Sequence, residues 1–149
     1  MKPTLANIQQ YASDAIANDP TLSTLGAPIK YSFFTADDAA RAAIQAALAA
    51  KGVCFEIGPV GATGDTDRTS RAITLNASFD VFVAESPKVA HSPSEMTLVE
   101  AVAAAIQKRL DAYTHNARCT NYESALSENG YVLHVLSFTT PLSLAVSGT

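Results

Sequence analysis

Some residues in this sequence have types and spacing that could do chemistry, beginning with a glycine-rich stretch. This stretch resembles a phosphate-binding loop in composition and reads Gly58-Pro59-Val60-Gly61-Ala62-Thr63-Gly64. Such a loop ends in Gly-Lys-Ser/Thr and leads directly into a helix, whereas here Asp65 follows the last glycine. The carboxylates of Asp65 and Asp67 would also repel a phosphate. We therefore expect the tip of a hairpin here and no nucleotide site.

Two further groups contain residue types that bind metal ions. Asp65-Thr66-Asp67 could offer two carboxylates to a hard cation, but a calcium loop needs more oxygen ligands at set spacings. His115 and Cys119 are four residues apart, as on one side of a zinc site, but a structural zinc site needs a second pair and none is near. We expect a solvated loop in the first case, and a loop histidine with a core cysteine in the second.

The remaining histidines and cysteines have no catalytic spacing. We expect His134 to be a half-exposed sheet residue and His91 to be solvated. Cys54 and Cys119 lie far apart and are interpreted as reduced, buried thiols, with one disulfide as the alternative. A Ser/His/Asp or Cys/His set could still meet in the fold, but no GxSxG nucleophile elbow is present. Our expectation is that the protein is not an enzyme and has no catalytic, cofactor or metal-binding residues.

Size and charge narrow the class of protein. The 149 residues suit one domain, covering 1–149. The net charge is −4 and the ten Lys and Arg residues are scattered, so we do not expect sequence-specific nucleic-acid binding, which needs a basic patch. No run of 18 apolar residues suggests a membrane span. Charged residues make up 16%, less than the usual quarter. There are two explanations for this low charge: part of the apolar surface binds a partner protein, or the many alanines raise the apolar fraction without forming a large patch.

Three helices are expected from apolar periodicity. The first covers Leu5 to Asn18 and ends before Pro20. The second covers Thr35 to Lys51, with Thr35 as its N-cap and Gly52 as the left-handed residue that ends it. The third covers Pro93 to Ala112, where Ser92-Pro93-Ser94-Glu95 has the pattern of a capping box. Its apolar stripe consists of Val99, Val102, Ala103, Ile106, Leu110 and Tyr113.

Strands are expected between and after these helices. The strongest signal is the alternation from Arg71 to Ala84, which predicts a long central strand with Ile73, Leu75, Phe79 and Val81 buried. Asn129-Gly130 is a strong hairpin signal. The other expected strands are Ile29–Phe34, Val53–Val60, an edge strand at Ala117–Ser124 and Tyr131–Thr140, followed by an unpatterned tail after Pro141. Together these predict an α+β fold in which an antiparallel sheet of three to five strands packs with two or three helices.

This order of elements resembles a family of virion proteins. Three elements follow one another along the chain. They are a long alternating strand that ends in Val81-Phe82-Val83-Ala84-Glu85-Ser86-Pro87, a capped amphipathic helix, and a final strand, Tyr131-Val132-Leu133-His134-Val135-Leu136-Ser137-Phe138. The pattern, from about Val53 to Leu142, resembles the bacteriophage tail terminator and tail completion (head–tail joining) proteins. The resemblance implies a subunit that forms a homo-oligomeric ring, typically a hexamer, and contacts tail tube and head-connector proteins. It also implies assembly in the host cytoplasm into the virion.

A ring would need two different interaction surfaces on each copy. The segments without a core pattern are Gly61–Arg71, Glu85–His91, Asn116–Glu128 and Leu142–Val146. We expect the interface to use Arg68 and Arg71 on one side, and Glu123 and Glu128 on the other. These segments could instead be ordinary surface loops. Alternatives for the function are another tail or head-closure structural protein, or a small-ligand-binding α+β module.

Overall fold

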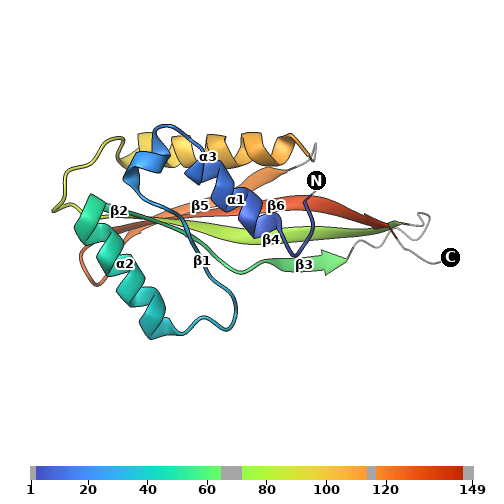
Figure 1. The fold of residues 1–149 in the computed structure, drawn as a ribbon, viewed down its shortest axis with the longest axis horizontal. Coiled ribbons are helices and arrows are strands. Elements are labelled where there is room, and N and C mark those ends of the chain that lie inside the picture. Colours follow the sequence, from blue (N-terminus) through green and yellow to red (C-terminus); the bar gives the residue numbers. More distant parts are fainter. Residues whose placement is uncertain (1–2, 65–71, 114–116, 146–149) are drawn as a thin grey trace.

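The computed structural model describes residues 3–64, 72–113 and 117–145, which fold around one sheet (Figure 1). The elements are α1 (Ile8–Ala17), a 3-10 turn η1 (Leu22–Leu25), β1 (Ile29–Lys30), α2 (Asp37–Lys51), β2 (Val53–Ile57), β3 (Gly61–Gly64), β4 (Ala72–Glu85), α3 (Glu95–Asp111), β5 (Arg118–Leu126) and β6 (Val132–Ala145). The predicted α+β class is confirmed. The sheet has six strands, one more than expected, because the glycine-rich stretch contributes β3.

The sheet is built around β4. Its strand order is β1-β2-β4-β6-β5, and β3 also pairs with β4. β1 runs parallel to β2 and the other pairs are antiparallel, so the sheet is mixed rather than purely antiparallel. Helices α1 and α3 cover one face, and α2 lies across the other face at one end (Figure 1).

The alternation in β4 correctly predicted its buried face. Phe79 and Val81 are buried on the side of α1 and α3, while Leu75 is half-buried; the side chain of Ile73 lies outside the described part. The Phe79 ring stacks on Phe138 of β6, with 5.7 Å between ring centroids. Because side chains alternate across a strand, the polar residues between them face the opposite side of the sheet.

Helix α3 packs on this face through the predicted stripe, but its start differs from the prediction. Val99, Val102, Ile106 and Leu110 are buried, together with Leu98. The helix begins at Glu95, two residues later than expected, and its N-cap residue Ser94 makes no side-chain hydrogen bond. The predicted capping box is therefore wrong. The amide of Glu95 is satisfied instead by a carboxylate from β4, described below.

Of the two predicted ends of α2, the C-terminal one is correct and the N-terminal one is wrong. Gly52 has φ 78°, the left-handed conformation expected after the last helical residue. The Thr35 cap is wrong, because Ala36 is the N-cap residue and Thr35 Oγ1 accepts a hydrogen bond from the Ser32 amide at 2.9 Å. Ahead of this helix the expected strand is short, and Phe33 and Phe34 are 78% and 97% exposed.

The segment after Pro141 was expected to be unpatterned, and this was wrong. β6 continues to Ala145 and stays paired with β4, with Pro141 opposite Asn76. A proline inside a strand lacks an amide for the ladder, so prolines are confined to strands with one open side. Pro141 lies two residues beyond Thr139, the last β6 residue with a described partner on β5.

Candidate functional site

The predicted interface residues fall into two groups. Glu123 on β5 and Glu128 in the turn after it are exposed, whereas Arg68 and Arg71 lie outside the described residues, as do Asp65, Asp67 and His115. Cys54 is buried as expected, but Cys119 is exposed, and neither forms a disulfide. Within 3–64, 72–113 and 117–145, no three His, Cys, Asp or Glu side chains are grouped to hold a metal ion.

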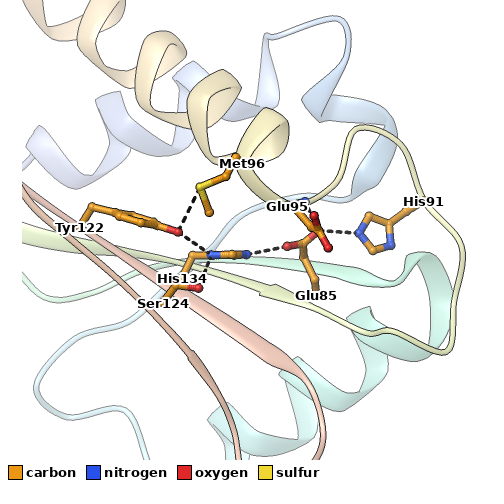
Figure 2. Close-up of polar contacts among 7 residues, drawn as sticks. All are labelled: Glu85, His91, Glu95, Met96, Tyr122, Ser124 and His134. Carbon is orange, nitrogen blue, oxygen red and sulfur yellow. Dashed lines mark hydrogen bonds and ion pairs between the residues drawn. The ribbon is translucent and has the colours of Figure 1, made fainter.

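The expectations for two histidines were wrong. His134, expected to be half-exposed, is 2% exposed, and the side chain of His91, expected to be solvated, is 8% exposed. Both rings bind the carboxylate of Glu85, the last residue of β4 (Figure 2). We call Glu85, His91 and His134 the Glu85 cluster.

Glu85 joins four parts of the fold through its two oxygens. Oε1 accepts hydrogen bonds from His91 Nε2 and from the backbone amide of Glu95, both at 2.8 Å. Oε2 lies 2.5 Å from His134 Nε2. The carboxylate thereby connects β4, the loop after it, the first residue of α3 and β6. A negative charge is also favourable at a helix N-terminus, where amide groups have no partner within the helix.

The charge of Glu85 follows from these donors. Burial alone would raise the pKa of Glu85, but hydrogen bonds from His91, the Glu95 amide and His134 together lower it below 4.5. The carboxyl group is therefore ionised at neutral pH.

Both ring nitrogens of His91 have hydrogen-bond partners. Its Nε2 faces the Glu85 carboxylate, and its Nδ1 lies 2.9 Å from the carbonyl oxygen of Val89. These two contacts pin the loop to the end of β4.

The other side of His134 contacts two hydroxyl groups from β5. Nδ1 lies 3.0 Å from Ser124 Oγ and 3.2 Å from Tyr122 OH. The Tyr122 ring is stacked on the imidazole, and its hydroxyl also contacts Met96 Sδ at 3.6 Å. Nδ1 can make one of these hydrogen bonds at a time, and the Tyr122 hydroxyl can instead donate to Met96 Sδ.

Ser124, His134 and Glu85 thus lie in the order of a nucleophile, a base and a carboxylate that orients the base. Two observations favour a structural role over catalysis. Tyr122 competes with Ser124 for the same nitrogen. The cavity of about 240 Å³ beside the cluster is lined by Glu85, His91 and Glu95, on the far side of His134, and Ser124 does not line it.

A second buried carboxyl group, Glu56 on β2, has no cation beside it in the described structure. Burial raises its pKa from 4.5 to about 7, and a hydrogen bond from Tyr31 offsets part of that rise. Burial, followed by the proximity of Glu56, likewise raises the pKa of the Cys54 thiol to about 12. Cys54 Sγ lies 4.0 Å from Glu56 Oε1. Glu56 therefore folds most favourably as the neutral acid.

One signal for the Glu85 cluster is present in the sequence of β4 itself. Glu85 has the same parity in β4 as the buried Val81 and Val83, so the alternation places it on the same face of the strand. An acidic residue on the buried face must have polar partners, because an isolated buried charge is strongly unfavourable. His134 supplies one from 49 positions away, a pairing that only the sheet register brings about.

Comparisons with known proteins bear on the fold. No protein-family model and no curated protein matches the chain. A chain in a solved structure described as the virion of a native gene transfer agent (GTA) particle superposes with a TM-score of 0.57. The match covers 91% of this chain and 93% of that chain at 14% sequence identity. The two chains share a fold over nearly their whole lengths. No helix in the described ranges is long and apolar enough to cross a membrane.

Proposed function

We propose that this chain is a structural protein of a phage-like virion, and that it acts by assembling with other proteins rather than by catalysis. The observation that carries the proposal is the shared fold with a chain of a gene transfer agent particle, which extends over more than nine-tenths of both chains. The contacts of the Glu85 cluster support a role without catalysis, because its carboxylate joins β4, the loop after it, α3 and β6.

Within the virion, the role that we propose is that of a ring-forming tail terminator at the head–tail junction. The order of elements from Val53 to Leu142 supports it through its resemblance to that family. In this role the chain would contact copies of itself, the tail tube and the head connector. It would be assembled in the host cytoplasm and reside in the virion.

The proposed contact between copies uses the outer edge of the sheet. β5 is the last strand in the sheet order, and all nine of its residues are exposed. An edge strand offers unpaired backbone groups that another chain can cover. Glu123 and Glu128 place two negative charges at this edge, and we propose that Arg68 and Arg71 of the neighbouring copy pair with them. Ion pairs at the rim of an interface set register and partner choice.

The test is the oligomeric state of charge-reversed variants, measured by size exclusion with light scattering over a range of concentrations. Arg68→Glu with Arg71→Glu should weaken the oligomers, while the thermal midpoint of the isolated fold stays nearly unchanged. Adding Glu123→Arg and Glu128→Arg should restore assembly. Glu100→Arg, an exposed site on α3, is the control for charge alone. A parent chain that stays monomeric at high concentration would refute the ring. Unchanged oligomers in the double variant would refute this interface.

A further inference from the structure

A groove between α1 and α3 has an unusual charge arrangement. The cavity measures about 330 Å³ and contains two carboxylates and two cations, Asp14, Asp19, Lys108 and Arg109, among smaller residues. The four formal charges sum to zero, but the carboxylates and the cations differ in their partners.

Both carboxylates already have donors of their own. Asp14 Oδ1 accepts a hydrogen bond from Gln10 Nε2 at 2.7 Å. Asp19 Oδ1 accepts from the backbone amides of Thr21 and Leu22, both at 2.9 Å, and so begins the η1 turn. These bonds give the two acidic side chains a local structural role.

Neither cation has an anionic partner in the described part of the chain. Lys108 and Arg109 form no ion pair there. The Arg109 guanidinium is held over two aromatic rings, with its central carbon 5.0 Å from the Tyr11 ring centre and 5.6 Å from that of Tyr113. Its Nε is buried and has no hydrogen-bond partner among the described residues. A buried donor without an acceptor is unfavourable, so the guanidinium is held in place with one of its donors unpaired.

The position of the cations on α3 accounts for only part of this. Both lie in the last turn of the helix, where positive charge is favoured by the helix dipole. The dipole would be served equally well by two solvated side chains. It does not explain why the guanidinium lies over two aromatic rings beside an open cavity. The planar guanidinium of arginine can donate two parallel hydrogen bonds to a carboxylate. Aromatic rings that hold the guanidinium in one orientation prearrange it for such a ligand.

We propose that the groove between α1 and α3 receives a carboxylate from an acidic segment of a partner protein, with Arg109 and Lys108 as its binding residues. The inference rests on the proposed function only in that the partner is a protein. An acidic occupant is favoured because both carboxylates of the groove already accept hydrogen bonds, whereas the cations have no acceptor of their own among the described residues. Alanines at positions 15, 105 and 112 leave room for a main chain to approach.

The test uses a blocked tetraglutamate peptide as the probe, added to the full ¹⁵N-labelled chain at low ionic strength. The reporter is the Nε–H signal of Arg109, assigned by its absence from the spectrum of Arg109→Lys. We expect a saturable shift of this signal, and Lys108→Gln should weaken binding about tenfold, as the loss of one charge-assisted contact. Lys108 is exposed, so this variant should fold normally. Arg118→Gln on β5, an exposed cation outside the groove, should leave the affinity unchanged.

Three outcomes would overturn the inference: no saturable shift, equal weakening by Lys108→Gln and Arg118→Gln, or an equal shift with inorganic phosphate at matched ionic strength. The last would mark a site for small anions. Light scattering on the same samples separates this inference from the proposed function. A parent that assembles without binding the peptide refutes the groove alone, and one that binds the peptide without assembling refutes the ring alone.

Discussion

The buried carboxyl group of Glu56 should make the protein less stable as the pH rises towards neutrality. Its pKa is raised by burial from 4.5 to about 7, so between these values the folded chain holds a proton that the unfolded chain has released. Stability from the neutral acid is fully present below about pH 4.5 and is lost as the pH rises through about 7. The full difference corresponds to about 3 kcal/mol. Glu56→Gln removes the ionisation while keeping an acceptor for Tyr31.

The assay is urea unfolding of the parent and of Glu56→Gln between pH 4 and pH 8, at a concentration where both are monomeric. The variant should match the parent near pH 4 and exceed its free energy of unfolding by about 3 kcal/mol at pH 8. Glu85→Gln is the opposite control. The pKa of Glu85 is lowered by its donors, so that variant should be destabilised at neutral pH and approach the parent only as the pH falls below 4.5. A stability difference for Glu56→Gln that does not change with pH would refute the reasoning.

Two further predictions concern the packing around these groups. Phe79→Ala should lower the free energy of unfolding by about 3–5 kcal/mol, because Phe79 is buried against Phe138; a loss below about 1 kcal/mol in urea unfolding would mean that the site relaxes fully. Gly52→Ala should lower the thermal midpoint, since a Cβ there would lie 2.7 Å from the Val89 carbonyl oxygen and 2.9 Å from His91 Nδ1, at a φ of 78°. An unchanged midpoint would contradict this.

Local patterns predicted the elements whose buried face repeats along the chain. The alternation around Phe79 and Val81 located β4 because a slip of one residue would expose the whole apolar set. The stripe through Val102 and Ile106 located α3 for the same reason. Gly52 was predictable because few residues adopt a left-handed conformation at a helix end.

The misses share a physical cause, which is a partner distant in sequence. The start of α3 was misplaced because the carboxylate that binds its first amide comes from Glu85, on a strand, and not from Ser92. His134 was expected at the surface because its acceptor is 49 residues away. The end of β6 was missed because proline is rare inside strands, whereas here β6 stays paired with β4 from Pro141 to Ala145.

The pairing of β4 with β6 has a consequence for how the chain is made. The two strands face each other over 14 residues each, yet α3 and β5 separate them in sequence. Contacts of such long sequence separation form slowly, because the intervening chain must first be brought together. As the protein leaves the ribosome, β2 and β3 can pair with β4 at once, while the other edge of β4 must wait for β6. During that interval the nascent chain exposes a long apolar strand edge, which is the kind of surface that drives aggregation. We therefore expect the yield of soluble protein to depend on the rate of synthesis and on chaperones more than the stability of the finished fold would suggest.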